Sequence, residues 1–204
     1  MTNKTDNNFT DQYLISKVLS GDTNAFGAII KTTERLVAQI VFKMIPNVED
    51  RKDIAQDIYL KVFNKLAGFK YQSKLSTWIA QVAYNTCLDY LAKRKLVLPG
   101  KIYEDSRVDD ETFGSPGKES LFTTNNETEK MVTRKELTGI LQSGIEQLPP
   151  VYKTLITLYH NEELSYEEIA QITALPGGTV KSYLSRARKA LKENLLLNYK
   201  KEDL

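Results

Sequence analysis

Helical spacing of apolar residues, broken by one polar and acidic stretch, most constrains what this chain of 204 residues can fold into. Neither side of the break shows the strict alternation of a half-buried strand. Residues 99–126 combine prolines and glycines with clustered acidic side chains and few large apolar ones. Such a segment cannot offset the entropy of ordering by forming a core. The sequence therefore predicts an all-α protein, with helical domains at residues 1–98 and 127–204 and a flexible acidic linker between them.

Candidate capping residues indicate where the predicted helices begin. Thr10 and Asp22 are suited to cap the first two helices. Asn126 and Ser165 each precede a glutamate by three residues, the spacing of a capping box. Further helices are predicted over residues 49–66, 75–95, 151–161 and 165–174, and from residue 179 onward.

Composition excludes several classes of function. Hydrophobic residues make up 41% and charged residues 26%, the balance of an ordinary soluble protein. No apolar run approaches the length of a membrane span, and the N-terminus has no signal-peptide pattern. One cysteine, Cys87, and one histidine, His160, leave nothing for a disulfide, a zinc site or a serine-type triad. We expect a cytoplasmic protein with no membrane insertion, no metal, no cofactor and no catalytic residues.

The last predicted helix carries a concentrated basic charge. Residues 179–192 contain five basic and no acidic side chains, although the net charge of the whole chain is only +2. Val180, Leu184 and Ala187 are predicted to face inward. The preceding helix ends in a turn that contains Gly177 and Gly178, so the pair is predicted to form a helix-turn-helix that binds DNA.

Position along this helix separates base readout from phosphate contact. Residues near the start of a recognition helix reach base edges, and later ones reach phosphates. A merely solvated amphipathic face is the alternative. The candidates for base readout are Thr179, Lys181, Ser182, Ser185 and Arg186, and those for phosphate contact are Arg188, Lys189 and Lys192.

Aromatic and basic side chains also alternate around residues 69–95. Stacking and backbone neutralisation are what a single-stranded nucleic acid requires. The alternative is that the aromatic residues belong to the core, which we favour for Trp78. Tyr71 and Tyr84 are expected to be exposed.

The predicted helix 49–66 has polar residues, Asp53, Gln56, Asp57 and Asn64, beside its apolar stripe. Carboxylates four residues apart on a helix repel each other slightly, so they do not stabilise the helix itself. Binding of a basic partner helix would explain their presence. A catalytic carboxylate pair and a solvated face are the alternatives. No predicted base or metal ligand accompanies a catalytic pair.

Two stretches resemble a known family. DRKDIAQDIYLKVFNKLAGFKYQSKLSTWIAQVAYNTCLDYLAKRK resembles region two of bacterial sigma factors. LPPVYKTLITLYHNEELSYEEIAQITALPGGTVKSYLSRARKALKENL is similar to their region four. The chain has no region-three domain between the two stretches. In this it resembles members of the extracytoplasmic-function branch of the sigma-70 family.

The resemblance implies a role for each surface. The loop of residues 68–73 would help to capture a flipped base. Ala92 stands where members often carry an arginine, which leaves open which following basic residue contacts the DNA backbone. Asp53, Gln56 and Asp57 would bind the β′ coiled coil of core RNA polymerase, with Ile54, Ile58 and Phe63 on the packing side. The −10 element would meet Tyr71, Lys74, Ser76, Thr77, Trp78, Gln81, Asn85, Lys93 and Arg94. The −35 element would meet Gly178, Thr179, Lys181, Ser182, Ser185, Arg186, Arg188 and Lys189.

These implications describe a transcription initiation factor whose partners are core RNA polymerase (β′ coiled coil and β flap), promoter DNA and an anti-sigma factor. An autonomous helix-turn-helix regulator is the alternative. Such a regulator would need an effector or dimerisation module in place of the first domain.

Overall fold

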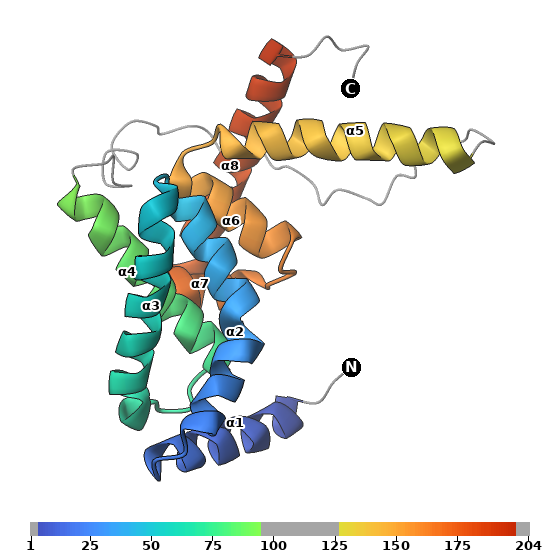
Figure 1. Cartoon of the computed structure of the whole chain (residues 1–204). Helices are drawn as coiled ribbons and strands as arrows, with labels where there is room; N and C mark the ends of the chain where they lie inside the picture. Colours follow the sequence, from blue (N-terminus) through green and yellow to red (C-terminus); the bar gives the residue numbers. More distant parts are fainter. Residues whose placement is uncertain (1–3, 95–126, 199–204) are drawn as a thin grey trace.

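Helices form the regular structure of the chain in the computed structural model (Figure 1), which describes residues 4–94 and 127–198, and the side-chain surroundings of residues 10–94 and 137–198. The all-α prediction is confirmed for these residues, and the predicted linker and Asn126 lie outside them. The elements are α1 Lys4–Leu19, α2 Thr23–Met44, α3 Val48–Lys65, the short 3-10 helix η1 Leu66–Gly68, α4 Leu75–Lys93, α5 Glu127–Glu146, α6 Pro150–His160, α7 Tyr166–Thr173 and α8 Gly177–Asn198.

Helix α1 begins earlier than predicted. Thr10, the expected N-cap, lies inside α1, because no glycine or proline stops a helix between residues 4 and 19. Gly21 ends the connection to α2 with a φ of +95°, a conformation that favours glycine. Asp22 then caps α2 as predicted, its carboxylate accepting two backbone N–H groups at 2.9 and 3.3 Å.

The start of α4 is capped from another helix. Lys74, the residue before α4, offers no side-chain cap. Asp11 of α1 instead accepts a hydrogen bond from the backbone N–H of Leu75 at 3.2 Å. Burial raises the pKa of Asp11, and the hydrogen bond from Leu75 opposes that rise. Helix α1 therefore positions the N-terminal end of α4.

The predicted capping box of α7 is confirmed. The hydroxyl of Ser165 accepts the backbone N–H of Glu168 at 3.2 Å, and the Glu168 carboxylate accepts the backbone N–H of Ser165 at 3.1 Å. Ala174 ends α7 in the left-handed region with a φ of +55°. This sharp turn leads into α8, so α7 and α8 form the expected helix-turn-helix.

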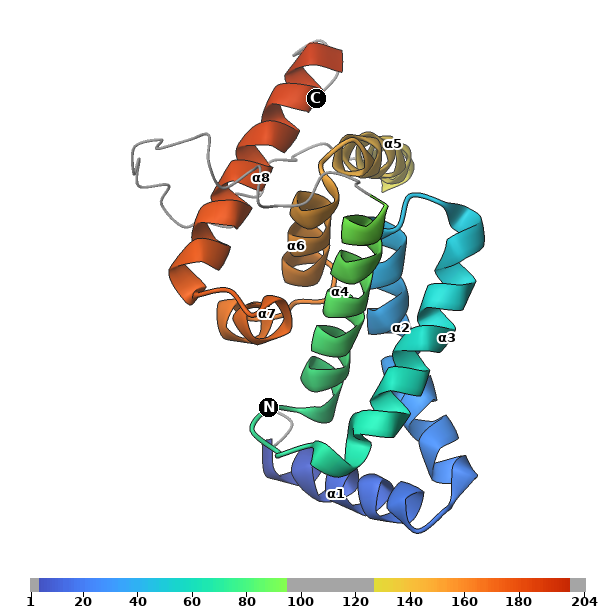
Figure 2. The same ribbon diagram turned by 90° about the vertical axis from the view of Figure 1, so that its left-hand side faces the viewer.

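The N-terminal and C-terminal helices pack against one another. Helix α4 lies between α3 on one side and α7 on the other (Figure 2), and α2 packs against α6. The neighbouring α4 residues Leu75, Thr77, Ile79 and Ala80 are all buried. At about 100° per residue these positions cannot share one face, so α4 is covered on several sides.

Two glycines of α5 lie in opposite surroundings and give a stability test. A Cβ added at the exposed Gly139 would meet nothing within 4 Å, whereas one at Gly144 would lie 2.9 Å from Cδ1 of Leu191 and 3.0 Å from Cδ2 of Leu195. We expect Gly139→Ala to raise the free energy of unfolding by about 0.5–1 kcal/mol, because alanine favours the helix.

Gly144→Ala is expected to gain less or to destabilise, because both leucine side chains of α8 must move to admit the methyl group. Urea unfolding followed by circular dichroism measures both changes. Equal gains at the two positions would contradict the observed packing of α5 on α8.

Candidate functional site

A row of polar side chains runs along the outer face of α3. Asp53, Gln56 and Asp57 are exposed, whereas Ile54 and Ile58 are 6% and 0% exposed. The three polar residues thus share a free face, while the isoleucines hold the helix on the bundle. Two carboxylates on this face make it acidic, which suits a basic partner helix.

Two exposed apolar residues, Leu60 and Phe63, also lie on α3. Phe63 was predicted to lie on the packing side, but its side chain is 50% exposed; its ring packs edge-to-face with that of Phe26, at 5.1 Å between ring centroids. That assignment is wrong, because position 63 lies at the margin of the buried stripe. Leu60, which sequence reasoning missed, is 61% exposed and follows Asp53 by seven residues, two helical turns later. The sequence signal that could have identified Leu60 is its spacing, which places an apolar residue on the same helix face as Asp53, Gln56 and Asp57.

An aromatic cluster occupies the loop between η1 and α4. The ring of Phe69 lies 4.8 Å from that of Tyr71 and 5.2 Å from that of Trp78. Phe69 is buried, Trp78 is half-buried and Tyr71 is 38% exposed. Tyr71 has a φ of +56°, which side-chain-bearing residues rarely adopt. The expected exposure of Tyr71 is confirmed, and Trp78 packs in part as a core residue.

Helix α4 exposes only part of the predicted −10 set. Thr77 is 4% exposed, so it can contact DNA only if the residues packed over it move away. Tyr84 is 2% exposed, so the expectation that it is exposed is wrong; α7 covers α4 in addition to α2 and α3. The exposed members of the whole set are Tyr71, Lys74, Asn85, Lys93 and Arg94, and the half-buried members are Ser76, Trp78 and Gln81.

Arg94 joins the end of α4 to the start of α3. Its Nη2 lies 3.1 Å from Oδ2 of Asp50, and its guanidinium lies 4.9 Å from the ring centroid of Tyr90. The Tyr90 hydroxyl donates to the same carboxylate. That hydrogen bond, helped by the charge of Arg94 and opposed by burial, holds the pKa of Asp50 below its ordinary value. Arg94 is thus paired within the protein although its side chain, like that of the neighbouring Lys93, is exposed.

Helix α8 has the predicted division into a buried and an exposed face. Val180, Leu184 and Ala187 are fully buried, as predicted, and Tyr183 is 3% exposed in addition. The exposed candidates for DNA contact are Gly178, Lys181, Ser182, Ser185, Lys189 and Lys192, and the half-buried ones are Thr179, Arg186 and Arg188.

Arg188 rests on an aromatic stack. Its guanidinium lies 5.1 Å from the ring centroid of Tyr159, which stacks on Tyr166 at 5.1 Å. Burial, followed by the charge of Arg188, lowers the pKa of His160 beside them. The stack fixes the direction in which the Arg188 side chain leaves the helix.

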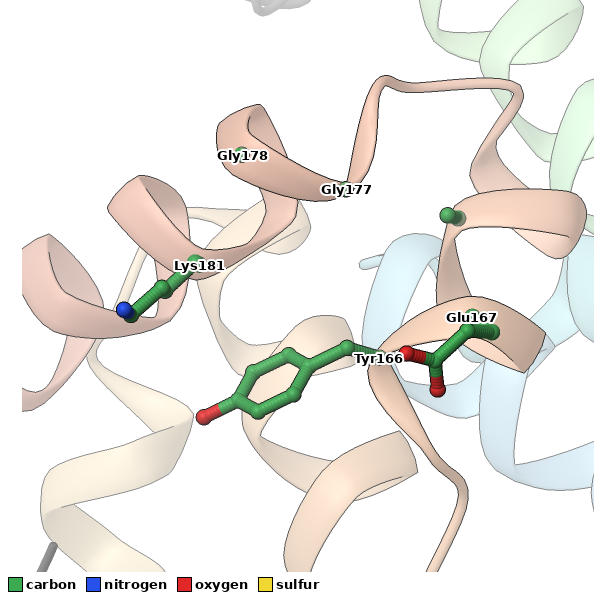
Figure 3. Close-up of a pocket in the computed structure, with 6 residues that line it drawn as sticks. Tyr166, Glu167, Gly177, Gly178 and Lys181 are labelled. Carbon is green, nitrogen blue, oxygen red and sulfur yellow. The ribbon is translucent and has the colours of Figure 1, made fainter.

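A pocket opens between α7 and the first turns of α8 (Figure 3). Tyr166 and Glu167 reach it from α7, and Lys181 reaches it from α8. Two residues of the predicted −35 set, Gly178 and Lys181, therefore border a hollow at the helix-turn-helix. The lining residues are Tyr166, Glu167, Ala170, Gly177, Gly178 and Lys181.

Within residues 4–94 and 127–198, no three His, Cys, Asp or Glu side chains lie together in a way that could hold a metal ion. None of the helices in this part of the chain is long and apolar enough to cross a membrane.

Both halves of the chain match models of one protein family. Residues 29–97 match Sigma-70 region 2, and residues 138–191 match Sigma-70, region 4. The ECF RNA polymerase sigma factor SigW of Bacillus subtilis (strain 168) is 32% identical over 184 residues, which cover 89% of this chain and 94% of SigW. This chain belongs to the extracytoplasmic-function branch of the sigma-70 family.

Other sigma factors align over similar lengths. The ECF RNA polymerase sigma-E factor of Escherichia coli (strain K12) is 34% identical over 89% of this chain and 92% of its own. Among solved structures, CnrH in complex with the cytosolic domain of CnrY has a TM-score of 0.60 at 20% identity, covering 93% of this chain and 99% of CnrH. The sigma factor RpoE in complex with the anti-sigma factor NepR from Bartonella quintana has a TM-score of 0.56 at 20% identity, covering 85% and 98%. This extracytoplasmic-function sigma factor thus has the fold of both.

Proposed function

We propose that this sigma factor binds core RNA polymerase in the cytoplasm, directs it to specific promoters and assists in opening the duplex, with no catalytic chemistry of its own. The observation that carries the proposal is the presence, in one chain, of an exposed acidic row on α3 and a helix-turn-helix with a basic exposed face. Residues 1–98 would bind polymerase and the −10 element, and residues 127–204 would bind the −35 element. Residues 99–126 would connect them.

The polymerase surface is the outer face of α3. Asp53, Gln56 and Asp57 offer charge and hydrogen bonds to the β′ coiled coil, and Leu60 adds an apolar contact beside them. The buried Ile54 and Ile58 keep this face in position. The C-terminal helices would contact the β flap.

The two promoter elements would be recognised in different ways. Opening the −10 element needs a surface for unpaired bases, which Tyr71 and the aromatic cluster behind it offer. Reading the −35 element needs a helix in the major groove, and α8 presents Lys181, Ser185 and Arg186 near its start. The proposal also includes an anti-sigma factor as a partner.

Co-elution with core RNA polymerase tests the proposal. The purified chain is mixed with polymerase and a library of duplex DNA, and each mixture is resolved by size. We expect the chain to elute with polymerase, and specific DNA to be held only when both are present; sequencing that DNA yields the promoter motif. Binding of specific duplex by the chain alone, with no binding to polymerase, would instead support an autonomous regulator.

A further inference from the structure

The loop between η1 and α4, residues 69–74, is held at both ends by α1. Helix α1 lies across the end of the bundle from which this loop leads into α4 (Figure 1 and Figure 2). At the start of the loop, α1 packs against η1. At its end, the Asp11 carboxylate of α1 accepts the backbone N–H of Leu75 at 3.2 Å. Two separate contacts from one helix therefore fix where the loop begins and where it ends.

Helix α1 is itself anchored in the bundle. Ile15 and Val18 are 2% and 6% exposed and belong to the core, and α1 also packs against α2. Asp11 precedes Ile15 by four residues, so both side chains lie on the inward face of α1. Lys74, the residue before α4, makes no side-chain cap, and Asp11 supplies the one that Lys74 lacks.

Tyr71, near the middle of the loop, has a backbone conformation that needs such support. Its φ of +56° lies in the left-handed region, which a side-chain-bearing residue keeps only where its surroundings impose it. The centroid of its ring lies 4.8 Å from that of Phe69, which lies 5.2 Å from that of Trp78 on the first turn of α4. The Tyr71 ring is thus supported by residues at both ends of the loop, where α1 makes its two contacts.

A ring that stacks on an unpaired base binds best when it is already in place. Ordering a loop at the moment of binding costs conformational entropy, which lowers the affinity gained from stacking. The Asp11 carboxylate faces the backbone of α4, and its charge would repel a DNA phosphate. Asp11 is therefore suited to act on DNA binding through the loop rather than by contact.

We propose that Asp11 is a positioning residue for the recognition of unpaired promoter bases: by capping α4 from α1, it holds the loop in the conformation that presents the Tyr71 ring. This proposal rests on the proposed function in one respect, since it takes Tyr71 to contact bases of the −10 strand. Helix α1 then contributes to promoter opening without touching DNA.

The experiment compares three single substitutions. Asp11→Ala removes the cap, whereas Asp11→Asn keeps an oxygen that can accept the N–H of Leu75 and removes only the charge. The matched control is Asp22→Ala, which makes the same substitution at the half-buried N-cap of α2. Circular dichroism verifies that all three variants retain their helices.

Trp78 is the single tryptophan of the chain, so its fluorescence reports on the aromatic cluster directly. In the free chain, we expect Asp11→Ala to shift the Trp78 emission to longer wavelength and to increase its quenching by acrylamide, because the uncapped end of α4 and the loop admit water. Asp11→Asn and Asp22→Ala should match the wild type. Wild-type emission and quenching in Asp11→Ala would overturn the proposal.

Base recognition is measured with the complex of polymerase and sigma factor. The probe is promoter DNA recovered by co-elution and prepared with mismatches that leave its −10 bases unpaired, and its affinity is measured by fluorescence anisotropy. We expect Asp11→Ala to weaken binding about five- to tenfold, while Asp11→Asn and Asp22→Ala keep wild-type affinity. Tyr71→Ala should weaken binding at least as much, because it removes the ring itself.

A double-mutant cycle distinguishes this role from a general loss of stability. If Asp11 acts through Tyr71, Asp11→Ala has no further effect on affinity in a chain that already carries Tyr71→Ala. An equal loss in both backgrounds would overturn the proposal. Co-elution with polymerase is checked first for every chain. Failure of the wild type to co-elute would refute the proposed function, whereas normal co-elution with unchanged DNA affinity in Asp11→Ala would refute the role of Asp11.

Discussion

Replacing Asp53 and Asp57 together with lysine is expected to abolish stable binding to core RNA polymerase, with a loss in affinity of at least about 100-fold. Both carboxylates lie on the exposed face of α3, and neither has a structural role in the bundle core. Charge reversal therefore replaces attraction to a basic partner helix with repulsion while Ile54 and Ile58 still hold the helix. The fold should be unaffected.

The matched control is Glu34→Lys with Glu193→Lys, which makes the same change in net charge on α2 and α8. Affinity is measured by displacement of a labelled wild-type chain from polymerase, and helix content by circular dichroism. If the Asp53 and Asp57 variant kept wild-type affinity, the polymerase surface would lie elsewhere on the molecule. If both variants lost affinity equally, overall charge rather than this row would govern binding.

Local signals in the sequence were sufficient for the starts of α2 and α7 and for the division of α8 into a buried and an exposed face, although not for the start of α1. Asp22 caps α2, and Ser165 with Glu168 caps α7, because these interactions involve residues two or three positions apart. Val180, Leu184 and Ala187 are buried because a period of 3.6 places them on one stripe. The basic face of α8 follows directly from that stripe.

Contacts between distant segments were beyond reach of the same reasoning. Asp11 caps α4 from α1, sixty-four positions away, and no local pattern predicts such a cap. Tyr84 is buried on a helix that α2, α3 and α7 all contact, and the contact with α7 requires the two halves of the chain to meet. From the sequence, Tyr71 and Tyr84 were expected to be exposed and Trp78 to belong to the core. In the structure Tyr71 is exposed, Trp78 is half-buried and Tyr84 is buried.

The two surfaces that we propose to bind promoter DNA differ in their exposure. The start of α8, with Lys181, Ser182 and Ser185, is exposed in the same structure in which Thr77 of α4 is buried. The residues proposed to read the −35 element are therefore exposed in this arrangement, whereas Thr77 of the proposed −10 set is not. Changes at the start of α8 should act on DNA recognition directly, without first altering the packing of the two halves.

Arg186→Ala is expected to reduce polymerase-dependent initiation by about 5- to 150-fold on the cognate promoter, with the loss confined to the −35 element. One well-placed arginine contact to a base edge contributes about 1–3 kcal/mol to discrimination. Arg186 is half-buried on α8 in the turn that follows Lys181 and Ser182, so its backbone position is fixed by the packing of Leu184 and Ala187.

Lys189→Ala is the matched control, because it removes one positive charge from an exposed position further along the same helix. Initiation is measured with both variants on two promoters that share a −10 element and differ only in the −35 sequence. Arg186→Ala should narrow the difference between the promoters, since a lost base contact matters only where the correct base is present. Lys189→Ala should weaken both promoters to a similar extent and reduce the dependence on salt, as expected of a phosphate contact. An equal loss on both promoters with Arg186→Ala would instead place Arg186 among the phosphate contacts, and base readout would then have to come from Lys181, Ser182 or Ser185.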